Sequence, residues 1–472
     1  MSDRRWKVVV EDWKGEVDQR SKQMNSLTFI LFLLPTIHSI WNDTFTAYWN
    51  VPSERCVKKY NVTFPLDRYN IVYNKGQKFI GDKIVLFYEY KTGLFPYYAD
   101  YDTQRPVNGG LPQKCNITAH LQMIEEMIYR EMPDENFDGP AIFDVEEWRP
   151  IFPSISIKSA TMIAEEEFNR AARKVLTSTL QLAKRLRPKA LWSMYGFPYC
   201  NYDAGQTGDL SCSVNFRNHN DRLRWLTDEF VILSPSIYLT LATNNTAANY
   251  RFIYSVIREA IRIGTKNNQP VVPYTKFEYN PYSSPEEHIY YSKRDLCNSL
   301  KLSSDAGAHG TLVWSTDRHI TLNRCMSVYE NVDNSLGPAV NLVRRRADRC
   351  SMERCSGHGR CVLRRPGEKC TFRLDPLEYN CQCDSSFYGE SWTTTEREEV
   401  RTERNEVMRE EGTLLTLVET ADDPPSIETN TIMSVVESST PFPLPAPFTI
   451  DDSSVIVVDS PPLPHSTTQD SF

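Results

Sequence analysis

Between about residues 45 and 340, short apolar runs rich in β-branched and aromatic residues alternate with longer amphipathic stretches. Residues 161–186 form the clearest amphipathic stretch: apolar side chains recur there at three- and four-residue steps, and Pro188 ends the pattern. This stretch is predicted to be a helix. The runs predicted to be strands are Ile84–Tyr90, Ala141–Glu146, Ala190–Phe197, Val231–Leu239, Val271–Tyr279 and Thr311–Ser315.

Alternation of strands and helices over so long a segment predicts an α/β domain with a parallel sheet. We find no glycine-rich nucleotide-binding turn after any predicted strand. A distorted TIM-like (β/α) barrel over residues 45–340 is therefore favoured over a doubly wound sheet. In such barrels the chemistry lies at the carboxyl ends of the strands, so the candidate residues are sought there.

The C-terminal part of the sequence has a different composition. Six cysteines fall within residues 350–383, including those of Cys355-Ser-Gly-His-Gly-Arg-Cys361. This density predicts a small EGF-like module over 350–392 that disulfides hold together. Residues 393–472 contain 16 Asp/Glu and 4 Lys/Arg, and they are predicted to be a disordered acidic tail. The formal net charge of −8 therefore hides a mildly basic body, which suits an anionic partner.

The N-terminal part carries one strongly apolar run, Leu27–Trp41, which is short and interrupted by Pro35. It is interpreted as the core of a signal peptide over 24–39, with 1–23 as a non-native or spurious extension; the alternative is a buried helix of the mature protein. No membrane span is expected. Four glycosylation sequons begin at Asn42, Asn61, Asn116 and Asn244.

The chain has twelve cysteines, which together with the sequons favour an oxidising compartment, so a secreted or lysosomal protein is predicted. Phosphate-binding, HExxH and CxxC motifs are absent from the sequence. We expect no metal, no cofactor and no nucleic acid, and we expect a monomer.

The strongest candidate for chemistry is the end of the strand at 141–146, where an apolar run leads into Asp144 and Glu146. Residues two apart on a strand point to the same side, so the two carboxyl groups are expected to lie together. Neighbouring carboxylates cannot both ionise freely, and one of them stays protonated, as a glycosidic general acid must. The plainer interpretation is a solvated acidic strand end or an ion pair with Arg149.

The segment Asp144-Val145-Glu146-Glu147-Trp148-Arg149-Pro150 resembles the catalytic strand of the hyaluronidase family, which has an aromatic residue where Val145 stands. Further segments resemble the family in the same order, over roughly residues 45–390. They are Gly93–Tyr98, Asn108–Gln113, Trp192–Cys200, Pro235–Tyr238, Leu312–Ser315 and Leu336–Pro338. By strand alternation Val145 and Glu147 point away from the carboxyl pair, so Val145 is expected to affect packing more than chemistry.

The resemblance implies a retaining, substrate-assisted hydrolysis of N-acetylhexosamine linkages. Glu146 would protonate the glycosidic oxygen, and Asp144 would orient the substrate acetamide and stabilise the charge on its nitrogen. Tyr195, Tyr238 and Trp314 would enclose the acetamide; without the resemblance, ordinary core packing is the simpler interpretation of these aromatic side chains. Arg149 would contact a substrate carboxylate or brace the strand, and the bracing role is favoured.

The resemblance also implies a disulfide map. Four bonds follow the family pattern, and Cys370–Cys383 and Cys115–Cys297 are assigned to the cysteines that remain, although sequence alone does not fix the connectivity. The four family bonds are Cys56–Cys325, Cys200–Cys212, Cys350–Cys361 and Cys355–Cys381.

The implied substrate is an anionic glycosaminoglycan, either chondroitin or hyaluronan. Val145 and Val256 depart from the hyaluronan-type pattern, Val256 standing where many relatives have an arginine, so chondroitin is favoured slightly. A non-catalytic glycan-binding or adhesion protein on the same fold is the main alternative. A chitinase-like enzyme is weaker, because its DxxDxDxE pattern is absent.

Overall fold

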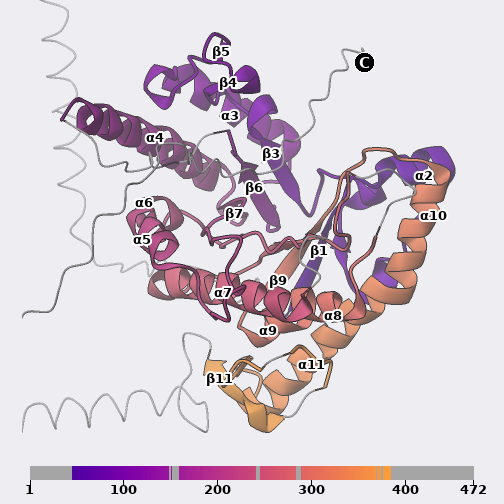
Figure 1. The fold of residues 1–472 in the computed structure, drawn as a ribbon. Coiled ribbons are helices and arrows are strands. Elements are labelled where there is room, and N and C mark those ends of the chain that lie inside the picture. The colour runs from indigo at the N-terminus through magenta and orange to yellow at the C-terminus, as the bar shows by residue number, and fades with distance from the viewer. Residues whose placement is uncertain are drawn as a thin grey trace, which may run out of the picture. The chain divides into compact units, whose positions relative to one another are not determined.

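A computed structural model of the chain describes residues 45–147, 150, 159–240, 245–282, 289–367, 369–373 and 376–383. All of them belong to one compact unit (Figure 1). The predicted N-terminal extension, signal peptide and acidic tail lie outside the described residues.

Parallel strands form the centre of this unit, in two sheets with the orders β2-β1-β9-β8 and β3-β6-β7. Isolated parallel bridges through the segment 233–236 connect β7 to β8 and join the sheets. This arrangement confirms the predicted parallel α/β barrel. The strands are β1 (Thr46–Asn50), β2 (Val72–Tyr73), β3 (Val85–Tyr88), β6 (Pro140–Asp144), β7 (Leu191–Met194), β8 (Tyr274–Thr275) and β9 (Gly310–Trp314).

Two predicted strands are much shorter than their apolar runs. Within 231–239 only single bridges form, and within 271–279 only β8 is regular. Pro235 and Pro273 lie inside these runs, and a proline has no N–H to donate to a strand ladder. The strands β1 and β2 were not predicted from the sequence.

A side chain completes the barrel between β2 and β3. Asn74 is fully buried; its amide donates to Ile84 O at 3.0 Å, and its Oδ1 accepts the N–H groups of Lys83 and Ile84, each at 2.8 Å. The asparagine thus takes the place of a missing strand residue and satisfies backbone groups that burial would otherwise leave unpaired.

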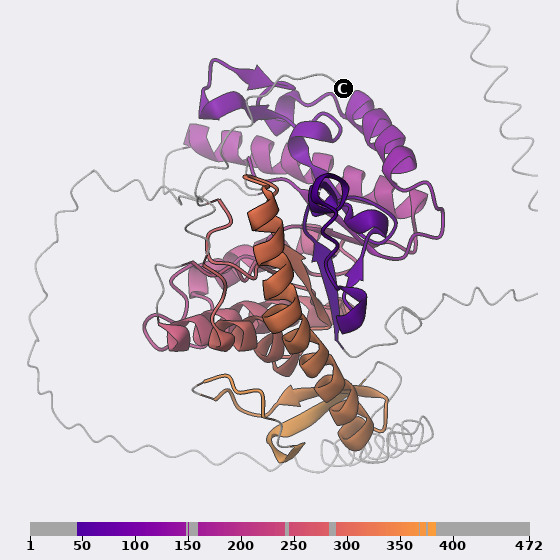
Figure 2. The same ribbon diagram turned by 90° about the vertical axis from the view of Figure 1, so that its right-hand side faces the viewer.

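Helices cover the outside of the strands, with α3 and α4 beside β3, β6 and β7 and with α7 and α9 beside β9 (Figures 1 and 2). The predicted helix at 161–186 is α4, which ends two residues before Pro188. The helices are α2 (Glu54–Tyr60), α3 (Ile117–Glu131), α4 (Ser159–Leu186), α5 (Val214–Arg222), α6 (Arg224–Thr227), α7 (Thr246–Gly264), α8 (Lys293–Leu296), α9 (Leu302–Asp305), α10 (Leu322–Asn331) and α11 (Gly337–Cys355).

Two π-helical segments continue these helices: Cys297–Lys301 links α8 to α9, and Val332–Leu336 links α10 to α11. Short 3₁₀ turns include η4 (Glu89–Lys91) directly after β3. A small antiparallel pair, β4 (Tyr97–Tyr98) and β5 (Pro106–Val107), lies in the connection from β3 to α3.

Residues 350–383, called here the C-terminal hairpin segment, contain the end of α11 and the antiparallel strands β10 (Gly359–Leu363) and β11 (Tyr379–Cys383). The predicted barrel domain ends at 340 and the predicted module begins at 350, but α11 runs through both boundaries without a break. A continuous helix thus leads from the barrel into the hairpin.

Strand alternation divides the core into two parts. Ile84, Leu86, Ile142, Leu191 and Leu312 fill the inside of the barrel, whereas their strand neighbours, such as Phe87 and Phe143, pack between strands and helices. The inner layer has Tyr88, Tyr195, Tyr238 and Trp314 packed against it as partly buried side chains. These four polar-tipped aromatic residues therefore border the interior where the site is expected.

Candidate active site

The position of the carboxyl pair follows from the alternation in β6. Ile142 points into the barrel, so Asp144 at the next inward position does too, while Val145 is 5 % exposed and packs in the outer core with Phe143. Glu146 lies two residues further on, beyond the end of the strand, and is exposed. The expectation that Val145 serves packing is confirmed.

Asp144 is held in an environment that disfavours its charge. Burial is the main cause that raises the pKa of this carboxyl well above its usual value, and the neighbouring carboxyl groups of Glu146 and Glu89 raise it further. Its Oδ1 is buried and has no hydrogen-bond partner within the described structure. A buried acceptor without a partner is uncommon in folded proteins and is a position where a ligand N–H would fit.

Glu89, in the 3₁₀ turn after β3, fixes the backbone that presents Glu146. Its Oε1 accepts the N–H groups of Glu146 and Glu147, each at 3.0 Å, and the side chain is 4 % exposed. Burial, together with the charges of Glu147 and Glu146, raises the pKa of Glu89 to about 8, although the two backbone N–H groups oppose the shift.

Glu89 was not predicted from the sequence. The signal was present, since Glu89 stands at the end of the neighbouring predicted strand 84–90, and the carboxyl ends of parallel strands meet at one edge. Glu147 points away from the pair, as expected, and its Oε1 accepts a hydrogen bond from the Tyr90 hydroxyl.

Three aromatic residues predicted from separate strand ends come together beside Asp144. The ring centroids of Tyr195 and Tyr238 are 5.9 Å apart, and those of Tyr238 and Trp314 are also 5.9 Å apart and nearly parallel. The Tyr195 hydroxyl donates to Ser236 Oγ at 3.2 Å. The Asp144 charge contributes to raising the pKa of Tyr195 and of Tyr238, although burial is the largest cause in both.

Further side chains at this edge were not predicted. Tyr274 packs edge-on against Tyr195 at 5.2 Å, and Tyr282 packs against Trp314 at 6.2 Å. Burial raises the pKa of Tyr282 to about 12, and the charges of Glu146 and Asp144 add to this shift. Lys276 Nζ lies 5.1 Å from the centre of the Tyr238 ring, and burial lowers its pKa to about 8. We call Asp144, Glu146, Glu89 and the aromatic residues Tyr195, Tyr238 and Trp314 the strand-end site.

Arg149 and Val256, two further residues of the resemblance, do not contribute to the described strand-end site. Arg149, together with Trp148, lies outside the described residues. Val256 is 2 % exposed and packs in the outer core on α7. A side chain buried there does not reach the strand-end site, so Val256 does not support a preference for chondroitin over hyaluronan.

The disulfides confirm four predicted bonds and correct two. Cys56–Cys325, Cys200–Cys212, Cys350–Cys361 and Cys355–Cys381 are present. The predictions Cys370–Cys383 and Cys115–Cys297 are wrong, because Cys370 bonds to Cys297 with their Cα atoms 5.8 Å apart. The loop before β11 folds back along the helix layer, which brings Cys370 to Cys297.

Cys115 lies in a different part of the fold, where its Sγ is 3.5 Å from Leu94 O. Of the sequon residues, Asn61 and Asn116 are exposed, whereas Asn42 and Asn244 lie outside the described residues. Within the described ranges no group of His, Cys, Asp and Glu side chains has a metal-binding arrangement, and no helix there is long and apolar enough to cross a membrane.

A parallel barrel with paired carboxyl groups and an aromatic wall at its strand ends is the arrangement found in barrel glycoside hydrolases. Comparison with known proteins identifies the family within this class. The family model described as hyaluronidase matches residues 35–154 and 151–411. The chain therefore belongs to the hyaluronidase family, and it is a glycoside hydrolase.

Individual relatives agree. A chondroitin hydrolase of Caenorhabditis elegans is 38 % identical over 373 residues, which cover 73 % of this chain and 79 % of the relative. Human hyaluronidase-1 is 32 % identical over 371 residues, covering 72 % and 83 % of the two chains. The crystal structure of bee venom hyaluronidase with a hyaluronic acid tetramer is 30 % identical with a TM-score of 0.56, covering 63 % of this chain and 98 % of that one.

Proposed function

We propose that the chain is an endo-β-N-acetylhexosaminidase that hydrolyses glycosaminoglycans with retention, using Glu146 as the general acid and the substrate acetamide as the nucleophile. The observation that carries the proposal is the buried Oδ1 of Asp144, which has no hydrogen-bond partner among the described residues. It lies two residues from an exposed Glu146 and beside an aromatic wall. That arrangement fits an acetamide N–H at Asp144 and a glycosidic oxygen at Glu146.

In the first step Glu146 gives its proton to the glycosidic oxygen while the bond from that oxygen to the anomeric carbon breaks. The acetamide carbonyl oxygen forms a bond to the same carbon and yields a cyclic intermediate. Water then attacks the anomeric carbon, the bond from that carbon to the acetamide oxygen breaks, and the Glu146 carboxylate takes up the proton that the water loses. Two displacements at one carbon retain its configuration, and no nucleophile from the protein is needed.

The interaction of Asp144 with the substrate acetamide strengthens during the reaction. The acetamide nitrogen becomes positively charged as the cyclic intermediate forms, so its N–H binds a carboxylate more strongly than in the ground state. Burial and like charges raise the pKa of Asp144 in the substrate-free protein. A positive charge developing next to it offsets this cost, and an interaction that strengthens in the transition state accelerates the reaction.

The aromatic wall gives the acetamide a shaped environment. Tyr195, Tyr238 and Trp314 have ring contacts in series, so they provide apolar surface for the acetamide methyl group and polar tips for its carbonyl oxygen. Holding the acetamide in a folded-back position is the orientation step that substrate-assisted catalysis requires.

The substrate we favour is chondroitin, with hyaluronan as the alternative. The preference is supported by the higher identity to the nematode chondroitin hydrolase, 38 %, than to human hyaluronidase-1, 32 %. Secretion, the EGF-like nature of the C-terminal hairpin segment and a monomeric state remain predictions. The five disulfides are consistent with an oxidising compartment.

The test compares the wild-type chain with Glu146→Gln on chondroitin and on hyaluronan, with initial rates and binding measured in parallel. We expect the variant to lose about three orders of magnitude in turnover, because the amide has no acidic proton to give, and to keep its affinity within about twofold. Equal and negligible turnover of both proteins, with binding retained, would instead establish the non-catalytic glycan-binding alternative.

A further inference from the structure

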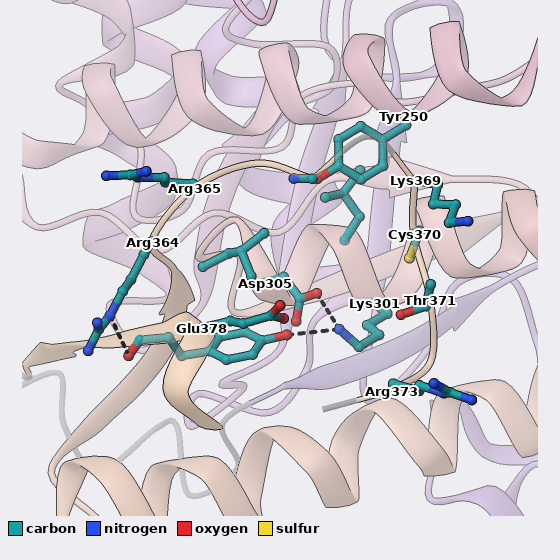
Figure 3. A pocket seen from close by; sticks show the side chains of 14 residues that line it. Tyr250, Lys301, Asp305, Arg364, Arg365, Lys369, Cys370, Thr371, Arg373 and Glu378 are labelled. Atoms are coloured by element: carbon teal, nitrogen blue, oxygen red, sulfur yellow. Dashed lines mark hydrogen bonds and ion pairs between the residues drawn. The ribbon is translucent and has the colours of Figure 1, made fainter. Parts of the chain in front are cut away.

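The described structure contains a further cavity, on the outer side of the helix layer. A cavity of about 580 Å³ lies between α7 and α9 on one side and the loop and strand ends of the C-terminal hairpin segment on the other (Figure 3). Its volume falls within the range of ligand-binding pockets. We call it the flank pocket; the strand-end site, in contrast, opens at the carboxyl ends of the barrel strands.

Cations dominate the lining of the flank pocket. Arg364 and Arg365 stand on one side of the opening, and Lys369 and Arg373 stand on the other (Figure 3). All four are exposed, and within the described ranges no carboxylate forms an ion pair with Arg365, Lys369 or Arg373. Cations gathered around one cavity repel one another, and an anionic ligand relieves that repulsion.

The acidic groups that the structure describes at the pocket are fewer than its cations. Asp305, in the floor, forms an ion pair with Lys301, whose Nζ also donates to the Tyr379 hydroxyl at 2.9 Å. Lys301 is only 5 % exposed, so this pair is an internal one. Glu378 is the remaining acid among the described lining residues, so these lining side chains carry a net positive charge. Glu368 and Asp375 of the same loop lie outside the described residues.

The pocket is also held in shape before any ligand binds. The Cys297–Cys370 bond fastens the loop to the barrel helix, and Gly367 N donates to the Tyr250 hydroxyl at 3.0 Å. Arg364 Nε donates to Tyr379 O at 3.3 Å and links the loop to β11. A preformed site loses less conformational entropy on binding than a flexible basic loop would.

We propose that the flank pocket binds a sulfate- or carboxylate-bearing segment of a glycosaminoglycan chain, as a second binding site separate from the strand-end site. The choice of this anion rests on the proposed function, whereas the pocket and its charge do not. A long chain that occupies both sites is held more tightly than a short fragment, because the second contact is intramolecular.

The test uses the full chain with Glu146→Gln, so that no probe is cleaved. The pocket variant adds Arg365→Glu and Arg373→Glu to this background. The control variant instead adds Lys174→Glu and Arg185→Glu on α4, which make the same change in net charge on exposed residues away from the pocket. Calorimetry with a chondroitin sulfate tetrasaccharide counts the sites, and a long chondroitin sulfate chain reports the affinity.

We expect two tetrasaccharide sites in the background and in the control, and one in the pocket variant. Affinity for the long chain should fall at least about fivefold in the pocket variant at about 0.1 M salt and less than about twofold in the control. Equal losses in both variants would reduce the effect to net charge and overturn the proposal, as would two sites in the pocket variant.

Sodium sulfate, compared with sodium chloride at the same ionic strength, distinguishes the polysaccharide from a free anion. Complete displacement of the tetrasaccharide from the second site by dilute sulfate would identify a small-anion site and overturn the assignment. Should the charge reversals disturb folding, Arg365→Gln with Arg373→Gln removes the charges alone and should lose affinity in the same direction. Turnover is not read in this experiment, so a failure of the proposed catalysis is seen separately, in wild-type rates.

Discussion

The strand-end site and the flank pocket both gather like charges, but they do so with opposite sign and different exposure. At the strand ends, Asp144 and Glu89 are carboxyl groups whose pKa is raised, chiefly by burial. At the flank pocket the cations are exposed, and only Lys301 is buried, next to Asp305. Burial at the strand ends disfavours the charge of the carboxylates, whereas the cations outside the barrel are exposed and are suited to binding an anion.

The largest effect is expected from neutralising the Asp144 carboxyl group at the strand-end site. Asp144→Asn keeps the shape but lacks a carboxylate for the charged acetamide nitrogen, so kcat on chondroitin should fall about 10²- to 10³-fold with little change in KM. A fall in kcat of less than about threefold would contradict the role given to Asp144.

The same variant has a stability readout. A carboxyl group whose folded-state pKa is raised makes its full contribution to stability below its unfolded-state pKa, and that contribution is lost as the pH rises. We therefore expect Asp144→Asn to melt at the same temperature or higher than the wild type at neutral pH. This advantage should disappear in acid, in thermal unfolding measured across the pH range. Glu126→Gln, which removes an exposed carboxylate on α3, is the matched control.

The next largest effect is expected at Glu89, which acts by positioning Glu146. Glu89→Ala removes the acceptor of two backbone N–H groups, so kcat should fall about tenfold or more, while Glu89→Gln keeps a carbonyl acceptor and should restore most of it. A rate loss that is as large with Gln as with Ala would mean that the charge of Glu89, not its hydrogen bonds, matters.

Glu89 also predicts a pH dependence of stability. Its pKa rises from 4.5 to about 8 in the folded chain, so its contribution to stability is full below pH 4.5 and is lost progressively up to about pH 8. The melting temperature of the wild type should therefore fall over this pH range more steeply than that of Glu89→Gln. Parallel pH profiles for the two proteins would contradict the raised pKa.

The smallest effect on catalysis is expected from the Cys297–Cys370 bond, although its effect on stability is large. It closes 73 residues, so Cys297→Ala with Cys370→Ser should cost about 4 kcal/mol of unfolding free energy by chain-entropy reasoning. Turnover of a tetrasaccharide should stay within about twofold, because the bond lies outside the strand-end site.

Loss of the Cys200–Cys212 bond should have the opposite balance of effects on stability and activity. That bond closes a short loop, 12 residues in separation, directly after Tyr195. Its loss should cost less stability and more activity than the loss of Cys297–Cys370. Equal effects of the two changes on tetrasaccharide turnover, measured on chains that remain folded, would remove the functional distinction between barrel end and flank.

The sequence by itself determined the features that depend on local periodicity. Alternation in the strand at 141–146 placed Asp144 and Val145 on opposite sides, and the helical pattern of 161–186 agreed with α4 within two residues at its start. It also identified Tyr195, Tyr238 and Trp314 as a group, through a family resemblance and not through physics. Without the resemblance, packing would have explained the same residues equally well.

Only the tertiary structure decided which distant segments meet. Glu89 holds the backbone of Glu146 across 57 residues, Cys370 reaches Cys297 instead of Cys383, and Val256 is buried rather than facing the substrate. The cations of the flank pocket come from one short loop, but the buried Lys301–Asp305 floor beneath them comes from a barrel helix. Strand and helix periods fix the direction of a side chain relative to its own backbone, whereas its partners depend on how the whole chain packs.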